Sequence, residues 1–191
     1  MRPRALDRRK TLRTRVSGQG LRSRTREPLE AHWPQIRAVW GATVFGAFAT
    51  VAEDGSAQLT PIGSVYLHPN EPRGYFHPIS AARLQKNLTA RENFELLFVD
   101  GRVSSRLPAW VRGRFDRLVA VRLRGHAVGP RRPANAEELE RWRRRVRAVR
   151  WTRGHDLLWK EVRFGQELAF DAYVPVRFGA MRHGAAIGRD S

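Results

Sequence analysis

The order of apolar and polar positions predicts a chain built mainly of β-strands. Two strand-like runs, residues 43–52 and 57–67, flank the pair Asp54-Gly55. An Asp-Gly pair between such runs favours a hairpin, because both central residues of the turn must tolerate positive φ. The second run then alternates between two faces, as expected of a strand with one face buried.

Thr60-Pro61-Ile62-Gly63 interrupts the regular pattern of the second run. Proline removes a donor from the hydrogen-bond ladder and glycine removes a side chain. We therefore predict a strand edge, a bulge or a place where another group approaches the backbone. The alternative that needs no ligand is an ordinary edge-strand irregularity.

Further strands are predicted at the short aromatic run around Tyr75-Phe76 and over residues 94–100, 117–128 and 167–178. In residues 117–128, three basic side chains share one face of the strand. That face fits either water or an anionic ligand.

Two helices and one loop are predicted around these strands. The first helix begins near Pro34, since a proline at the first helical position loses no hydrogen bond, and it ends at Gly41. Asn135 and Glu138 form the pattern of a capping box, and an arginine-rich helix follows them. Residues 101–114 show no clear periodicity, so a loop is predicted there.

A helix predicted over residues 81–91 carries the clearest candidate chemistry. Ser80 can accept a hydrogen bond from a first-turn N–H, and the other free N–H groups leave a partial positive charge at this end. Arg83 and Lys86 add positive charge on nearly the same face. Together these groups suit a phosphate. The alternative is an ordinary amphipathic helix with solvated basic residues.

The order of these elements resembles a known family. A strand, an Asp-Gly turn, a strand with Thr-Pro-Ile-Gly, a short aromatic strand, the sequence S-x-x-R-x-x-K-N-L and the strand FELLFVD are similar to the flavin-binding split barrels related to pyridoxamine 5′-phosphate oxidase. The resemblance covers residues 37–100, and more loosely residues 117–128 and 167–178. It implies a mainly β fold with flanking α-helices, a split β-barrel of the FMN-binding type. It also implies a homodimer with FMN at the interface.

The resemblance indicates which residues would hold the cofactor. The phosphate would contact the start of the helix after Ser80, the ring would lie along the Thr-Pro-Ile-Gly strand, and His77 would lie near the ribityl or phosphate end. Trp110 could stack on a bound ring, or it could anchor its loop to the core. The cofactor-binding residues expected in this way are Thr60, Pro61, Ile62, Gly63, His77, Ser80, Arg83, Lys86, Asn87 and Trp110.

The chain departs from the family at one point. The oxidases themselves carry S-R-K in consecutive positions, whereas this chain has Ala82-Arg83-Leu84 at the best alignment. This departure weighs against vitamin B6 chemistry itself.

Composition separates a folded domain from a basic extension. Hydrophobic residues make up 41% of the 191 residues, which is a globular composition. Residues 1–27 hold ten Arg or Lys against two acidic residues, and they show no apolar periodicity. We expect residues 1–28 to be a disordered basic arm and residues 29–191 to be the split-barrel domain. A stretch upstream of the true start codon and a nucleic-acid-binding arm are alternatives for residues 1–27.

Other sites and compartments receive little support from the sequence. The chain has no cysteine, which excludes disulfides, thiolate nucleophiles and cysteine-ligated metals. Its six histidines show no metal-ligand spacing. No apolar stretch follows Arg8-Arg9-Lys10, so an export signal is not predicted and a cytoplasmic location is expected.

We therefore expect a flavin-dependent oxidoreductase that acts on a small molecule and has no membrane association. The cofactor is expected to be FMN, with deazaflavin F420 as the alternative. A flavin carries out the electron transfer, so the protein needs no obvious acid–base set. Two other classes stay open: a non-catalytic flavin- or haem-binding protein on the same fold, and a basic nucleic-acid-binding module. The arginine-rich helix after Asn135 is the main argument for the latter, and Trp151 and Trp159 could stack bases beside it.

Overall fold

A computed structural model describes most of the chain. The described residues are 29–79, 81–115, 117–159, 161–176 and 182–183. The basic arm expected over residues 1–28 lies outside the described residues, as does Ser80.

Seven strands form one antiparallel sheet in the order β2-β1-β5-β7-β8-β4-β3. Their bounds are β1 Gly46–Val51, β2 Ala57–Ile62, β3 Val65–Leu67, β4 Arg73–Phe76, β5 Asn93–Val99, β7 Ala120–Pro133 and β8 Phe164–Pro175. A separate parallel pair joins β6, Arg114–Phe115, to β9, Arg182–His183. The predicted mainly β class is confirmed.

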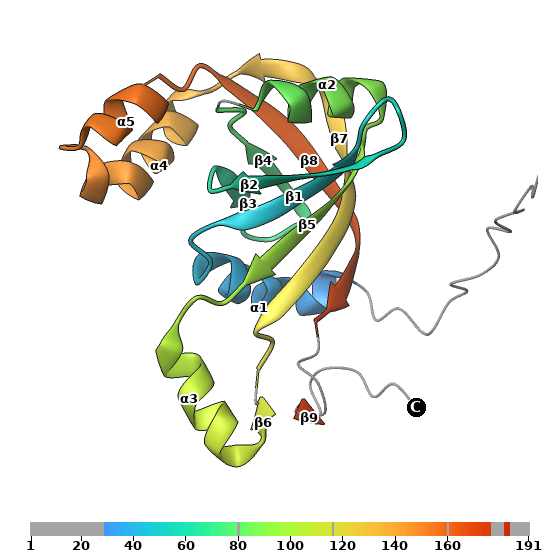
Figure 1. The fold of residues 1–191 in the computed structure, drawn as a ribbon, viewed down its shortest axis with the longest axis vertical. Coiled ribbons are helices and arrows are strands. Elements are labelled where there is room, and N and C mark those ends of the chain that lie inside the picture. The colour runs from blue at the N-terminus through green and yellow to red at the C-terminus, as the bar shows by residue number, and fades with distance from the viewer. Residues whose placement is uncertain (1–28, 80, 116, 160, 177–181, 184–191) are drawn as a thin grey trace, which may run out of the picture.

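The sheet is rolled so that its two edges meet (Figure 1). Strands β2 and β3 occupy opposite edges of the sheet, yet only Gly63 and Ser64 separate them in the chain. Three extended peptide units span at most about 11 Å, so the two edges must be neighbours. The predicted β-barrel is therefore confirmed, and its wall is interrupted where β2 passes into β3.

Large apolar side chains fill the barrel. The Phe48 ring lies 5.3 Å from the Phe76 ring and 4.8 Å from the Phe94 ring, measured between centroids. Leu96 and Leu123 are fully buried beside them. Burial of each such side chain stabilises the fold by roughly 1.5–3 kcal/mol.

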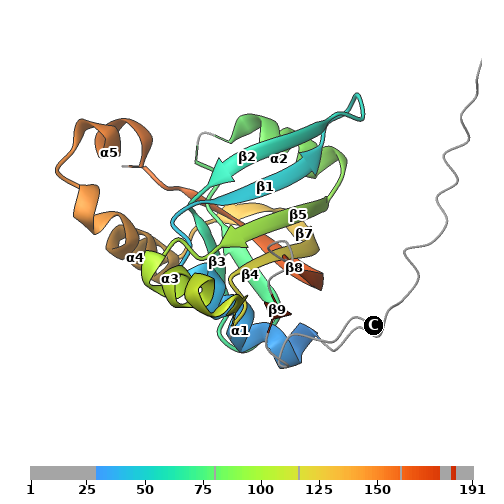
Figure 2. The same cartoon turned by 60° about the horizontal axis from the view of Figure 1, so that its bottom comes forward.

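Two helices close the opposite ends of the barrel, as both views show (Figures 1 and 2). Helix α1 spans Leu29–Gly41 and contributes Ile36 and Val39 to the core. Helix α2 spans Ala82–Ala90 and contributes Leu84 and Leu88 to the same core. Each helix therefore buries its apolar face against the barrel interior.

The remaining helices lie outside the barrel wall. Their bounds are α3 Val103–Arg112, α4 Ala136–Val146, the 3₁₀ helix η1 Arg147–Val149 and α5 Arg153–Leu158. The predicted capping box of α4 is confirmed: Asn135 Oδ1 accepts from Glu138 N at 2.9 Å, and Glu138 Oε2 accepts from Asn135 N at 3.0 Å.

The predicted Asp54-Gly55 hairpin is also confirmed. Strands β1 and β2 pair from Gly46–Ile62 to Val51–Ala57, and Gly55 has a φ of +87°. Because β2 is at the edge of the sheet, the edge position predicted for Thr60-Pro61-Ile62-Gly63 is correct.

The predicted start of the first helix is wrong. Helix α1 begins at Leu29 and contains Pro34 in its interior. A proline there removes one helical hydrogen bond. Leu29 and Trp33, which both precede the proline, are buried, and Trp33 Nε1 donates to His68 O at 2.9 Å. Core packing of the first turns therefore outweighs the lost bond.

The loop predicted over residues 101–114 is also wrong, because α3 occupies most of it. Gly113 ends this helix in the left-handed region, at a φ of +65°. Ala109 is buried, whereas Leu107, Trp110 and Val111 are exposed. Because apolar residues 107, 110 and 111 face water, the sequence of this helix lacks the apolar stripe that would have predicted it.

Strand β7 runs five residues beyond its predicted end. The pairing of β7 with β8 shifts register between Val128 and Arg132, and Gly129 has a φ of +62°. A bulge of this kind accommodates Pro130 without ending the strand. The predicted end of this strand at residue 128 is therefore wrong.

We expect Gly125→Ala to lower the free energy of unfolding by about 3 kcal/mol. A Cβ at this position would lie 2.0 Å from the backbone oxygen of Ala169, so β7 and β8 would have to move apart. Urea unfolding measures the change. Gly41→Ala is the matched control, because a Cβ there meets nothing within 4 Å. Equal stability of the two variants would contradict the close approach of the β7 and β8 backbones at Gly125.

Candidate functional site

Helix α2 separates two surfaces at one end of the barrel. Lys86 and Asn87 lie on the side that faces the β1–β2 hairpin, where they contact Glu53 and Gln58. On its other side, Gln85 and other residues line a cleft. Two of the four predicted phosphate ligands, Lys86 and Asn87, therefore contact the β1–β2 hairpin.

The start of α2 differs from the prediction. The helix begins one residue later than predicted, at Ala82, with Ala81 at the N-cap position. The predicted cap by Ser80 lies outside the described residues. Free N–H groups of the first turn keep a partial positive charge when no side chain caps them. This end of α2 therefore remains suited to an anion.

Asn87 is a structural link. Its side chain is buried, and its amide nitrogen donates to Thr50 Oγ1 at 3.0 Å and to Gln58 Oε1 at 2.7 Å. These bonds fix α2 against both strands of the hairpin. Asn87 therefore positions the helix, and its N–H groups are already used within the protein.

The two predicted cations on α2 differ in their contacts. Lys86 Nζ lies 3.1 Å from Glu53 Oε2, and both side chains are about three-quarters exposed. An exposed pair of this kind contributes about 0–1 kcal/mol. Arg83 is exposed and forms no hydrogen bond or ion pair with any residue that the structure describes. Arg83 is thus the cation most available to an anion.

The outer face of the β1–β2 hairpin is apolar. We call this the hairpin face; it consists of Phe45, Ala47, Ala49, Val51, Ala57, Leu59 and Pro61. Leu59 is 71% exposed and Phe45 is 62% exposed. Phe45 lies beside Gly63, where an added Cβ would come within 3.2 Å of its ring. Ile62, on the opposite face of β2, is buried, and Thr60 is half-buried there.

The basic face predicted on β7 is largely engaged within the protein. Arg122 Nε donates to Glu95 Oε1 at 3.2 Å, and Arg124 Nε donates to Glu95 Oε2 at 3.1 Å. His126 Nδ1 lies 3.2 Å from Asp171 Oδ2. Because these side chains already have acidic partners, β7 is a less favourable place for an anion to bind than the surface around Arg83.

His77 is enclosed by aromatic rings outside the barrel. Only 1% of it is exposed, and its ring lies 5.8 Å from Tyr66, 5.4 Å from Tyr75 and 6.0 Å from Trp142, measured between centroids. Its Nδ1 lies 2.9 Å from Phe164 O, so Nδ1–H is the donor, and Nε2 has no hydrogen-bond partner. His77 is therefore enclosed by protein, which disfavours the predicted contact between this side chain and a cofactor.

Burial shifts the pKa values in this cluster. Burial lowers the pKa of His77 below 6.5, although the hydrogen bond to Phe164 O opposes the shift. Burial raises the pKa of Tyr75 to about 12 and also raises that of Tyr66. All three side chains are therefore uncharged at neutral pH.

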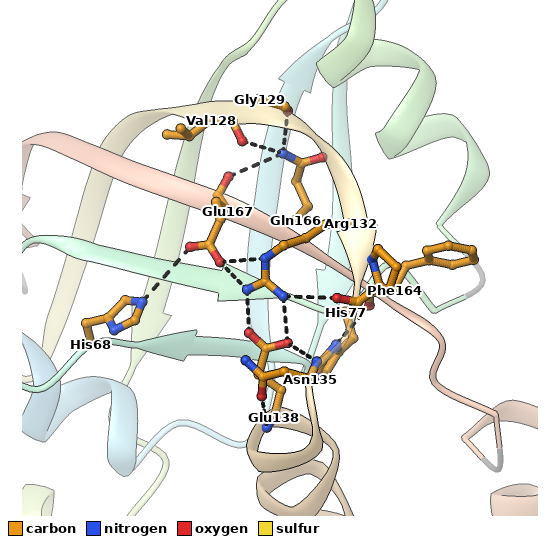
Figure 3. A network of polar contacts seen from close by, with 11 residues as sticks. His68, His77, Val128, Gly129, Arg132, Asn135, Glu138, Phe164, Gln166 and Glu167 are labelled. Atoms are coloured by element: carbon orange, nitrogen blue, oxygen red, sulfur yellow. Dashed lines mark hydrogen bonds and ion pairs between the residues drawn. The ribbon is translucent and has the colours of Figure 1, made fainter.

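An arginine at the end of β7 links three elements (Figure 3). Arg132 Nη1 and Nη2 donate to Glu138 at 2.9 and 2.5 Å, and its Nε donates to Glu167 at 3.1 Å. Burial alone would raise the pKa of Glu138, yet the bonds from Arg132 and the Asn135 backbone outweigh burial and lower it. The network ties α4 to β7 and β8. The sequence shows only its capping-box part.

Trp110 lies apart from the other predicted residues of the same chain. It is 58% exposed on α3, and both views place α3 away from α2 (Figures 1 and 2). It could therefore meet a cofactor at α2 only from another copy of the chain.

A cleft of about 860 Å³ opens on the other side of α2, between this helix and the β7 bulge. Its lining includes Gln85, Leu88, Arg131 and Gln166. None of the predicted site residues that the structure describes lines it. The cleft depends on the bulge and on contacts distant in sequence, so no local pattern indicates it.

Two further classes of site find no support in the described part of the chain. No group of three or more His, Asp or Glu side chains there could hold a metal ion. None of the described helices is long and apolar enough to cross a membrane.

Comparison with known proteins gives only structural likenesses. No family model matches the chain, and no curated protein matches it. Among solved structures, it is similar to an FMN-binding protein from Syntrophomonas wolfei, at 10% identity and a TM-score of 0.49 over 78% of this chain and 94% of the other. It is also similar to a candidate pyridoxamine 5′-phosphate oxidase from Listeria innocua, at 10% identity and 0.48 over 75% and 96%. An F420 reductase matches at 16% identity and 0.48 over 72% and 94%. Because these identities and TM-scores are low, the fold is assigned from the barrel of this chain itself, in which the two edges of the sheet meet.

We expect His77→Asn to flatten the pH dependence of stability between pH 6.5 and about 4.5. Because burial lowers the pKa of His77 in the folded state, the unfolded chain binds its proton more readily. The stability is full above pH 6.5 and falls as the pH drops below that value. Asparagine keeps a donor near Nδ1 but does not titrate.

Urea midpoints at a series of pH values test this expectation. Glu138→Gln is the comparison variant. It should lower stability at neutral pH because it breaks the bond to Arg132, but the lowered pKa of Glu138 confines the pH dependence that this residue contributes to values below 4.5. If the urea midpoint of the His77 variant depends on pH below 6.5 as steeply as that of the wild type, a group other than His77 causes the dependence.

Proposed function

We propose that this protein is a flavin-binding oxidoreductase that holds FMN along the edge formed by β2 and the start of α2. The observation that carries the proposal is Arg83, an exposed cation in the first turn of α2 that pairs with no described residue. Helix spacing puts it one turn before Lys86 and Asn87, which contact the β1–β2 hairpin. The substrate class is a small molecule.

The phosphate end of FMN fits the residues present. Arg83 supplies a fixed charge, and the free N–H groups of the first turn supply hydrogen-bond donors. Lys86 can leave its exposed pair with Glu53 at a cost of at most about 1 kcal/mol. Asn87 keeps α2 in place while this happens, because its bonds run to Thr50 and Gln58.

The ring end fits the edge of β2. In an edge strand, every second residue turns its backbone N–H and C=O away from the sheet. These groups suit the polar edge of an isoalloxazine ring. Leu59 and Pro61 offer apolar surface to the flat face of the ring.

A second copy of the chain would complete the site. The hairpin face is an exposed apolar patch, which on a soluble protein commonly marks an interface. A partner that covered it would exclude water from the ring. Trp110 of that partner, exposed on α3, is then available to stack on the cofactor.

The cofactor, when bound, would supply the electron transfer. The residues of this chain would bind it, orient it and limit its contact with water. His77 is buried away from solvent, so it does not supply a proton at this edge. A deazaflavin such as F420 would use the same phosphate and ring contacts.

A non-catalytic flavin- or haem-binding protein is the second candidate. It is favoured by one observation: neither β2 nor α2 contains a His, Asp or Glu that could act as an acid or base beside the cofactor. Turnover with a reductant and an acceptor separates the two candidates.

We expect the double variant Arg83→Ala/Lys86→Ala to bind FMN about 10–100-fold more weakly, because hydrogen bonds to charged groups contribute roughly 1.5–3 kcal/mol. Fluorescence titration with FMN, and separately with a deazaflavin, measures the affinity. The fold should be unaffected, since both side chains are exposed.

Arg91→Ala is the control for this experiment. It removes one exposed charge next to the same helix, at the C-cap of α2. Wild-type affinity in the double variant would move the phosphate site away from α2.

We expect Leu59→Asp to convert a dimer into monomers. The side chain is 71% exposed, so the change should alter monomer stability by less than about 0.5 kcal/mol while it places a charge in the proposed interface. Analytical ultracentrifugation measures the mass in solution. Leu157→Asp, at a side chain 78% exposed on α5, should leave the dimer intact. A dimer that survives both substitutions would exclude the hairpin face as its interface.

A further inference from the structure

Helices α4 and α5, with η1 between them, stand out from the barrel in both views (Figures 1 and 2). From Arg141 to Arg153 the chain contains seven arginines and no acidic residue. Helix α4 is held to the body of the protein by Arg145, whose Nη2 donates to Thr43 O at 3.3 Å and to Val44 O at 3.4 Å.

The arginines of this segment differ in what they contact. Arg143 and Arg144 share one carboxylate, Glu140, at 3.9 and 3.7 Å. Arg147, Arg150 and Arg153 are exposed, and their guanidinium groups form no hydrogen bond or ion pair with any described residue. Unlike the arginines of β7, these three have no structural use that the fold explains.

Trp151 lies in the middle of these free arginines. It is 86% exposed, which is unusual for the largest apolar side chain. Its Nε1 donates to Ala148 O at 3.1 Å, so the indole is fixed and its flat faces are open to a ligand. A fixed and exposed aromatic ring between guanidinium groups matches the way proteins stack single-stranded bases.

A small cleft opens beside the free arginines. Its volume is about 240 Å³, and its lining combines apolar side chains with cations: Leu139, Trp142, Arg143, Val146, Arg150, His155, Trp159 and Val162. Arg150 thus borders the cleft and also neighbours Trp151 in the chain. A flat apolar group joined to an anion fits such a lining.

We propose that the surface formed by Arg143, Arg147, Arg150, Trp151 and Arg153 binds single-stranded nucleic acid. The guanidinium groups bind successive phosphates, one base stacks on Trp151, and a neighbouring base enters the cleft. Bases in a duplex are stacked on each other and cannot take these positions. The binding is independent of base sequence, because every base has a flat face.

The cleft beside Arg150 favours a nucleic acid over an anionic membrane as the ligand of this surface. A membrane also attracts arginine and tryptophan side chains, but its surface has no flat group that would enter a cleft. The net charge of +18 adds long-range attraction to any polyanion. The proposal does not rest on the flavin site, since that site uses β2 and α2.

Fluorescence anisotropy of a labelled thymidine oligonucleotide, titrated with the full chain at several salt concentrations, tests the proposal. We expect Trp151→Ala to weaken binding at least about five-fold at one salt concentration, whereas Trp151→Phe should retain most of the affinity. The double variant Arg147→Gln/Arg150→Gln should reduce the dependence of log K on log salt by about 1.4, since each phosphate contact on a single strand contributes ~0.7.

Matched variants separate this surface from general charge attraction. Arg73→Gln/Arg91→Gln removes the same charge from two exposed arginines elsewhere, and Trp110→Ala removes another exposed tryptophan. Both should bind the oligonucleotide as the wild type does. The basic residues 1–28 are present in every variant, so they do not affect the comparison.

Three results would overturn the proposal. The first is no oligonucleotide binding at low salt. The second is an equal loss in the matched variants, which would assign the binding to net charge alone. The third is binding to vesicles of anionic phospholipid together with an oligonucleotide affinity that Trp151→Ala leaves unchanged, which would identify the surface as a membrane contact.

Discussion

The fold depends on the short connection between β2 and β3. Because two residues join strands at opposite edges, the sheet can exist only as a rolled barrel. Ser64 secures the join: its Oγ donates to His77 O at 2.6 Å, and its carbonyl accepts from His77 N at 3.1 Å. The rolled sheet encloses one face of the β1–β2 hairpin and leaves the other, which includes Phe45 and Leu59, outside. It thereby creates both the edge of β2 and the hairpin face.

A second constraint fixes the elements outside the barrel. Arg132 joins β7 to α4 and β8 through two carboxylates, and Arg145 joins α4 to the backbone before β1. Salt bridges with a buried partner such as Glu138 are costly to break, because one charge would remain unpaired. The arginine-rich segment is therefore held in one place relative to the barrel, although most of its surface faces water.

The sequence predicted the parts of this structure that local rules control. Strand alternation, the Asp-Gly turn and the capping box of Asn135 all depend on residues a few positions apart. The start of α1 was missed because burial of Trp33, a contact with distant residues, outweighs the local preference of Pro34. The family resemblance pointed to Asn87, but no local rule shows that Asn87 bonds to Gln58, which is 29 residues away.

Net charge alone does not say where this protein binds anions. Several arginines have structural tasks: Arg122 and Arg124 share Glu95, and Arg132 holds a network together. Among the described residues, Arg83 at the start of α2 and three arginines near Trp151 in the chain, Arg147, Arg150 and Arg153, make no such contact. The surroundings differ as well, since an open strand edge lies beside Arg83 and a fixed indole lies beside Arg150. A flat cofactor needs polar backbone groups next to the cation that binds its phosphate, whereas a single strand of nucleotides needs an aromatic ring on which a base can stack. The two places are therefore better understood as separate sites than as one basic surface.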